Sequence, residues 1–427
     1  MALSPQIANT SVGADRSWLF QLTKQQRSTL LATFGGWALD GMDVMAYTFV
    51  IPSLIVAWQI SKGQAGILAA VSLLVSSVGG WVAGLLADRF GRARVLQLTI
   101  AWFAFFTFLS GFTHSFWQLM LMRALQGLGF GGEWAVGSVL MGEAINAEHR
   151  GKAVGCVQGG WAIGWGIAAI FYGIFFSLLP TGIAWRAMFW IGILPAFLVF
   201  YIRRHVPEPE VYRKTRERVL GHDHVSGFLE IFRSPLLGTT LLTSVMTVGA
   251  QGGYYAITTW LPTYLKTTRG LSVLGTGLYL IVVIAGSFAG YIVSAYLTDR
   301  LGRKQTLTLF ALGSLVTVAA YTFIPIPNNM MLSFGFPLGF FPSGSFGPMG
   351  AFLTELYPTR LRGSGQGFSY NAGRSIGALF PPLVGFLSVR IPLGRAIALF
   401  SFGAYLLMIL AVSFLPETRG RELEVDG

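Results

Sequence analysis

Long apolar runs dominate this chain and most constrain what it can fold into. Crossing a hydrocarbon core of about 30 Å takes roughly 20 apolar residues of helix, and inside lipid only helices or closed barrels satisfy the backbone. Only 11% of the residues are charged, where a soluble domain carries about 25%. The sequence therefore predicts an all-α membrane protein. Twelve expected transmembrane helices lie at residues 28–57, 65–87, 95–113, 116–142, 152–179, 185–202, 236–264, 273–297, 305–325, 331–356, 364–388 and 393–415.

The longest polar interval divides these spans into two sets of six. We expect a cytoplasmic amino-terminal segment at 1–27, a first six-helix bundle at 28–202 and a central cytoplasmic loop at 203–235. A second bundle at 236–415 and a cytoplasmic tail at 416–427 follow.

The basic residues indicate how the chain is oriented. With both ends placed inside, the inside segments hold 22 of the 30 Lys and Arg residues, the bias expected of cytoplasmic loops. The polar first 26 residues lack the features of a cleavable signal peptide. We expect a multi-pass inner-membrane protein with both termini cytoplasmic.

The formal net charge of +12 suggests nucleic acid as a partner, but the basic residues fall in short loops between apolar runs. No nucleic-acid partner is therefore expected. The single cysteine, Cys156, excludes an intramolecular disulfide. We separately expect the protein to be a monomer.

Two acidic and basic motifs recur in both halves at a nearly constant offset. Residues 88–92 read Asp-Arg-Phe-Gly-Arg, and residues 299–303 read Asp-Arg-Leu-Gly-Arg, 211 positions later. A Glu followed after seven residues by Arg-Gly recurs in the same way, which indicates a tandem duplication. We expect ion pairs here to close one face and break when it opens, against the alternative that these loops only anchor the topology. The candidate gating residues are Asp88, Arg89, Arg92, Glu143, Arg150, Asp299, Arg300, Arg303, Glu355 and Arg362.

These motifs resemble those of the major facilitator superfamily, and the resemblance covers nearly the whole chain. The second copy departs from the usual pattern at Ala295, where glycine normally opens the motif. The resemblance implies two pseudo-symmetric six-helix bundles that rock about a central site. It also implies a transporter and not an enzyme.

A few charged residues lie inside the predicted spans, where charge is costly and normally functional. Asp40 and Asp43 are roughly 18 and 22 Å deep by helical rise, and Arg123 lies at a similar level. Two carboxylates on one helical face cannot both ionise at low cost in such a medium, so one can carry a proton while Arg123 balances the other. Glu133 is expected nearer the cytoplasm. A permanent ion cluster of Asp40, Asp43 and Arg123 is the structural alternative.

Arg374 has no acidic counterpart at its depth in the second half. Guanidinium binds carboxylate in bidentate fashion, so Arg374 is a candidate anchor for a substrate carboxylate. Pairing with an aspartate of the first half is the equal alternative. The expected binding neighbours are Asn371, Tyr370, Gln251, Tyr254, Trp37, Trp134 and Trp161, with helix packing as the alternative role of the tryptophans.

Residues 38–52, 123–134 and 158–165 are similar to the proton symporters of sialate, lactate and related carboxylates. By this resemblance Asp40, Asp43 and Glu133 would couple transport to protons, with Arg123 as their partner. The expected partners are a small organic anion, protons and the bilayer, with no cofactor or metal.

Several other functions stay open at this point. Aromatic-acid:proton symporters are similar in the first span, and a sugar or osmolyte symporter shares the Pro-Glu-Thr-Arg-Gly ending. A drug:proton antiporter usually has a Gly-Pro pair in the fifth span, which is missing here. A receptor or membrane enzyme is a further class, but the chain has no metal-spaced His/Cys cluster, nucleophile motif or phosphate loop.

Overall fold

The computed structural model describes residues 22–144, 150–208, 229–324, 327–358 and 361–419. Within these ranges the regular elements are all helical. The prediction of an all-α protein with twelve transmembrane helices in two bundles is confirmed. Among the described residues, eight helical stretches are long and apolar enough by themselves to cross a membrane.

The first half contains six spans. They are α2 (Lys24–Trp58), α3 (Lys62–Phe90), α4 (Arg92–Ser110), α5 (Phe116–Ala144), α6 (Arg150–Leu178), and a sixth made of α7 (Thr181–Trp190), η2 (Ile191–Ile193) and α8 (Pro195–His205). A short helix η3 (Leu229–Phe232) precedes the second half.

The second half repeats this order. Its spans are α11 (Leu236–Thr267), α12 (Val273–Leu301), α13 (Arg303–Phe323), α14 (Asn328–Gly344) with α15 (Phe346–Leu356), α16 (Arg362–Gly377) with α17 (Phe380–Leu387), and α18 (Leu393–Phe414).

Three spans expected as single helices, 185–202, 331–356 and 364–388, are interrupted. Proline explains the breaks in the first and third of these spans, because it lacks the N–H that bonds the preceding turn and its ring crowds the carbonyl there. Pro195 opens α8, and a proline lies in the first turn of α17. Pro52 and Pro262, by contrast, lie inside α2 and α11 without ending them, since packed neighbours tolerate such a site.

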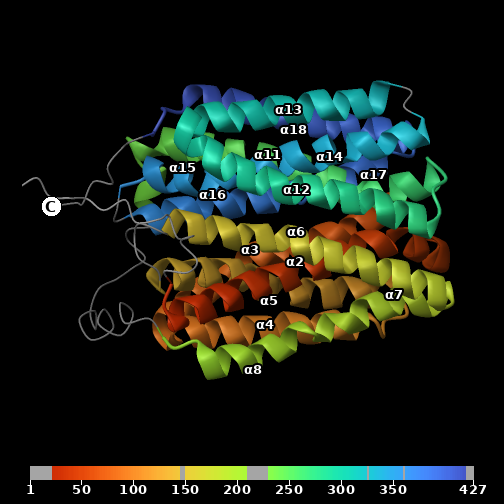
Figure 1. Ribbon diagram of the computed structural model, residues 1–427, viewed down its shortest axis with the longest axis horizontal. Coiled ribbons are helices and arrows are strands. Elements are labelled where there is room, and N and C mark those ends of the chain that lie inside the picture. The colour runs from red at the N-terminus through yellow and green to blue at the C-terminus, as the bar shows by residue number, and fades with distance from the viewer. Residues whose placement is uncertain (1–21, 145–149, 209–228, 325–326, 359–360, 420–427) are drawn as a thin grey trace, which may run out of the picture.

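The two halves lie side by side with their helices running in nearly the same direction (Figure 1). Contacts between the halves run along α6 and α12, and along α3 with α16 and α17. Because each half has six spans, α2 begins and α8 and α18 end at one end of the bundle. We call this the terminal end, and the opposite one the far end.

The halves meet backbone to backbone at the far end. A Cβ atom added at Gly66 of α3 would lie 2.6 Å from Pro382 Cα, and one at Gly385 of α17 would lie 2.5 Å from the Lys62 carbonyl oxygen. Added Cβ atoms at Gly155 and Gly367, near the terminal end, would meet no atom within 4 Å. The interface is thus closed by direct backbone contact at the far end.

Candidate functional site

Asp40 of α2 and Glu133 of α5 bring two carboxyl groups together inside the first half. Both side chains are buried, with 0% and 3% of their surface exposed. The carboxyl groups lie within hydrogen-bonding reach of each other, and no donor in the described residues bonds to any of their oxygens. Two ionised carboxylates in such contact would repel each other strongly, so the arrangement favours a pair that shares a proton. Glu133 therefore lies with the mid-membrane charges, deeper than its position along the helix indicated.

Gly36 makes this approach possible. It lies one turn before Asp40 in α2, and a Cβ atom there would overlap Glu133 Oε1 and lie 3.0 Å from Glu133 Cδ. At the neighbouring Gly35, an added Cβ atom would only touch Leu198, at 3.7 Å. The missing side chain at Gly36 thus leaves room for the carboxyl group of α5.

Asp43 has a different setting from Asp40, one turn away. Arg123 Nη1 lies 3.6 Å from Asp43 Oδ2, and the Gln126 side-chain amide donates a hydrogen bond to the same oxygen. Ser72 of α3 donates in turn to Gln126 Oε1 at 2.6 Å. The Arg123 guanidinium lies 4.9 Å from the ring centroid of Tyr47. All of these groups belong to the first half.

Arg374 of α16 lies at the boundary between the halves. Its guanidinium carbon is 5.0 Å from the ring centroid of Phe130 in the first half and 5.3 Å from that of Tyr370 in its own helix. The side chain is 2% exposed, and its Nε has no hydrogen-bond partner among the described groups. It is close enough to Asp40 for the two charges to interact, although no ion pair forms between them. Its role as a carboxylate anchor stays a prediction.

Aromatic rings from both halves surround this region. The Trp37 ring centroid lies 4.6 Å from that of Trp134 and 5.1 Å from that of Trp161. Trp134 faces Tyr370 of the second half at 6.2 Å, and Trp161 donates its indole N–H to the Tyr254 hydroxyl at 2.9 Å. We call these five residues, with Phe130, the aromatic cluster.

The two amides expected to bind substrate are engaged within the protein. Gln251 donates to the Tyr370 carbonyl oxygen at 2.8 Å and accepts from the Tyr255 hydroxyl at 3.1 Å. Asn371 donates to the Gly367 carbonyl oxygen of its own helix at 3.0 Å. Gln251 thus links α11 to α16, whereas the Asn371 amide is bonded within α16.

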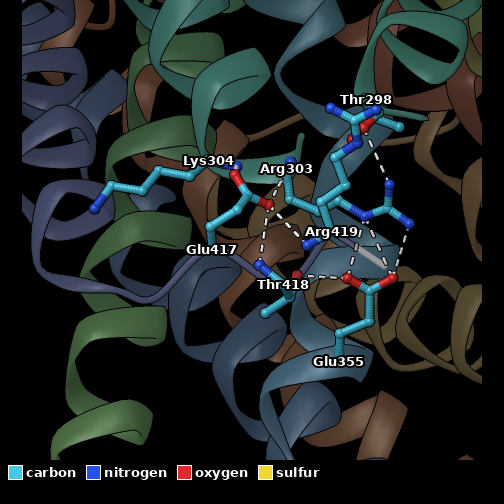
Figure 2. A network of polar contacts seen from close by, with 7 residues as sticks. All are labelled: Thr298, Arg303, Lys304, Glu355, Glu417, Thr418 and Arg419. Atoms are coloured by element: carbon cyan, nitrogen blue, oxygen red, sulfur yellow. Dashed lines mark hydrogen bonds and ion pairs between the residues drawn. The ribbon is translucent and has the colours of Figure 1, made fainter. Parts of the chain in front are cut away.

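The gating motif of the second half forms a polar network (Figure 2). Arg303 binds Glu355 through two nitrogens, with Nη2 to Oε1 at 2.9 Å and Nε to Oε2 at 3.1 Å. Arg303 Nη1 also donates to the Thr298 carbonyl oxygen at 3.0 Å, and the Thr418 hydroxyl bonds to Glu355. This network joins α12, α13, α15 and the segment after α18.

Glu417 caps the first turn of α13. It accepts from the backbone N–H groups of Arg303 at 2.9 Å and Lys304 at 3.1 Å, and also from those of Thr418 and Arg419 (Figure 2). Partial burial acts to raise the pKa of this carboxyl, but the four backbone donors outweigh it and lower the pKa below its ordinary 4.5.

Glu208 occupies the matching place in the first half. It accepts from the N–H groups of Ala93 and Arg94 in the first turn of α4, both at 3.2 Å. Gly91 and Gly302, just before these capped turns, have φ of +109° and +106°, a conformation that favours glycine. The duplicated motif is thus a duplicated structure.

Several predicted gating side chains lie outside the described part of the structure. They are Asp88, Arg89, Glu143, Arg150, Asp299 and Arg362. Arg300 is exposed and Arg92 is half-buried.

Sequence reasoning missed Phe130, Gln126 and Ser72. Phe130 and Gln126 are four residues apart on the face of α5 that also carries Arg123 and Glu133, so helical spacing from the charged residues was the available signal.

Comparison with known proteins gives concordant matches. A family model described as Major Facilitator Superfamily matches residues 33–382 and 296–425. The chain is 41% identical over 412 residues to a "Probable 4-methylmuconolactone transporter" of Cupriavidus pinatubonensis, covering 96% of this chain and 95% of the relative. It is 27% identical over 394 residues to a "Cis,cis-muconate transport protein" of Acinetobacter baylyi, covering 91% and 94%. A solved structure of the proton:xylose symporter XylE of E. coli superposes with a TM-score of 0.73 at 19% identity, covering 93% and 98%, a likeness of fold alone.

Proposed function

Because this chain belongs to the Major Facilitator Superfamily, we propose that it carries a small organic carboxylate across the membrane together with protons, by alternating access. The observation that carries this proposal is the place of Arg374. A buried cation lies between the two halves, with aromatic rings against it, and no acidic side chain of the described residues forms an ion pair with it. On the Lys and Arg bias of the loops, we place the protein in the inner membrane with its terminal end cytoplasmic.

The charge of the site favours an anionic substrate. A buried cation without a counter-ion is costly, and a substrate carboxylate would remove that cost while binding the planar guanidinium through two hydrogen bonds. A neutral sugar would leave Arg374 uncompensated. The names of the relatives, a muconate and a muconolactone transporter, point to the same class of small organic acid.

The aromatic cluster favours a flat substrate. Trp37, Trp134 and Trp161 from the first half and Tyr370 from the second offer ring faces around the guanidinium. Rings pack well against unsaturated or aromatic bodies in offset or edge-on contact. A flat acid would touch both halves at once, and its binding would draw them together. Transport of aromatic acids is included in this proposal.

The Asp40–Glu133 pair supplies the proton site of the mechanism. It lies in the first half, close to Arg374 of the second, so a proton and an anion would be bound near each other. When the substrate carboxylate binds Arg374, one further proton taken up by the acid pair cancels the added negative charge. A neutral loaded site can be enclosed between the two halves at a lower free-energy cost than a charged one. The halves therefore rock most readily when the proton and the substrate anion are bound together, and this couples their transport.

A thermal-shift assay on the purified protein tests the substrate class. We expect cis,cis-muconate, nicotinate or benzoate to raise the unfolding temperature of the parent, and the shift to disappear in Arg374→Gln. Arg395→Gln, which removes an exposed arginine of α18, is the matched control and should keep the shift. An equal shift in Arg374→Gln would overturn the anchor role of Arg374.

Uptake into proteoliposomes tests the coupling. An inside-alkaline pH gradient should drive accumulation of an acid that stabilises the parent. Accumulation driven by the opposite gradient would identify an antiporter, and no uptake of any stabilising acid would favour a receptor.

A further inference from the structure

The two aspartates of α2 differ in what surrounds their carboxyl groups. Asp43 receives a hydrogen bond from the Gln126 amide and lies 3.6 Å from a guanidinium nitrogen of Arg123. Asp40 faces only another carboxyl group among the described hydrogen-bonding groups. Donors and a cation favour an ionised carboxylate, whereas a second carboxyl group favours a shared proton. The two positions are therefore built for different charge states.

The orientation of the Gln126 side chain is the decisive detail. Ser72 donates to Gln126 Oε1 at 2.6 Å, and the amide nitrogen of Gln126 donates to Asp43 Oδ2. The reversed amide would place Oε1 against Asp43, which is tolerable only if Asp43 carries a proton. The chain from α3 through α5 to α2 is completely buried, so water does not compete for these bonds.

We propose that Ser72 and Gln126 hold Asp43 as a fixed anion beside Arg123, so that the transported proton is carried by the Asp40–Glu133 pair alone. This inference rests on the proton coupling proposed above. It gives different roles to Asp40 and Asp43, both of which the sequence analysis assigned to proton coupling. Gln126 and Ser72 act as positioning residues, because they reach the proton site only through Asp43.

The remaining neighbours of Asp43 agree with a fixed charge. Arg123 is the cation that faces it from α5, and Tyr47 and Asp40 are the titratable groups on its own helix. From α4, the hydroxyl of Thr107 approaches it. With Asp43 ionised, its charge and that of Arg123 cancel. The Asp40–Glu133 pair and Arg374 are then the groups whose charge changes when a proton and a substrate bind.

Infrared spectroscopy of the purified full-length protein tests this division without a substrate. The carbonyl stretch of a protonated carboxylic acid is separate from that of a carboxylate, so a pH titration reports which acids hold protons. The parent should show a protonated-acid band that Asp40→Asn removes or shifts. Asp43→Asn alone would leave Arg123 as a buried unpaired cation, so the pair is neutralised together as Asp43→Asn/Arg123→Gln. That double variant should keep the band.

Gln126→Met provides the sharper test, because methionine has similar size and no amide donor. Without the donor, Asp43 should gain a proton at low pH, and a second protonated-acid band should appear. Ser72→Ala should produce the same band more weakly, and Gln126→Glu should produce it strongly because two acids would then face each other.

Either of two results would overturn the inference: loss of the parent band in Asp43→Asn/Arg123→Gln, or an unchanged spectrum in Gln126→Met. Both readouts are independent of what the protein carries. If no carboxylate is transported but the bands behave as described, the substrate proposal fails while this assignment of the proton site stands.

Discussion

Trp161 of the first half donates its indole N–H to the hydroxyl of Tyr254 in the second half at 2.9 Å. Both side chains are buried, and both belong to the aromatic cluster. Because the bond crosses the boundary between the halves, a rocking motion at this level must either break it or carry both residues along.

Removing both partners of this bond should destabilise the protein by less than the sum of the two single effects. We expect Tyr254→Phe and Trp161→Phe each to lower the free energy of unfolding by about 1 kcal/mol through the lost hydrogen bond, with a further loss for the smaller ring at position 161. In a double-mutant cycle measured by thermal unfolding, the coupling energy should be about 1 kcal/mol. Additive single effects would show that the bond contributes nothing to stability.

Glycine at position 36 should matter for coupling more than for folding. In Gly36→Ala the new methyl group overlaps the end of the flexible Glu133 side chain, which can move aside at small cost but then leaves Asp40. We expect near-normal expression and unfolding temperature with loss of pH-driven accumulation, while exchange of labelled for unlabelled acid persists. Gly35→Ala is the adjacent control, since its methyl group meets only Leu198 at 3.7 Å, and it should accumulate acid normally.

The fold could be predicted largely from the sequence, because span length and charge in the loops follow from the cost of polar groups in lipid. The interruptions within the spans could not be predicted in this way. Proline at position 52 leaves α2 intact, whereas proline at position 195 opens a new helix. Neighbouring helices decide between these outcomes, and their packing is not readable from one chain segment.

The charged residues of the site could also be predicted from the sequence, because charge inside a membrane span is costly and rare. The contact between Asp40 and Glu133 could not be predicted. Helical rise placed Glu133 away from Asp40, because a depth estimate ignores helix tilt and the reach of a glutamate side chain. Phe130 was missed because it is one of 34 phenylalanines, and nothing in its type marks it as the ring against Arg374.

The Arg303–Glu355 pair should contribute modestly to stability and more to the transport rate. The two side chains are 14% and 13% exposed, so water screens the pair only in part. We expect Glu355→Gln to cost about 1 kcal/mol in unfolding free energy and to change the rate of uptake, because the network ties four segments together at the terminal end. If Arg303→Gln and Glu355→Gln leave both unfolding temperature and uptake rate unchanged, the pair is neither a structural tie nor a gate.

The cap on α13 gives a pH-dependent prediction whose sign is fixed by the lowered pKa of Glu417. A carboxyl whose pKa is lower in the folded state stabilises the protein above its unfolded pKa, and that contribution is lost as the pH falls through the folded value. Glu417→Gln should therefore lower the unfolding free energy by about 1 kcal/mol at neutral pH, the usual scale of a helix cap in partly exposed surroundings. The difference in unfolding free energy from the parent should close as the pH falls below the ordinary value of 4.5, because the parent carboxyl then becomes neutral as well.

Glu208→Gln is the matched variant in the first half and should cost less, since Glu208 accepts two bonds of 3.2 Å where Glu417 accepts four shorter ones. Thermal unfolding of the three proteins across this pH range decides the matter, and a gap between Glu417→Gln and the parent that stays constant in acid would show that the charge of the cap is not what stabilises α13.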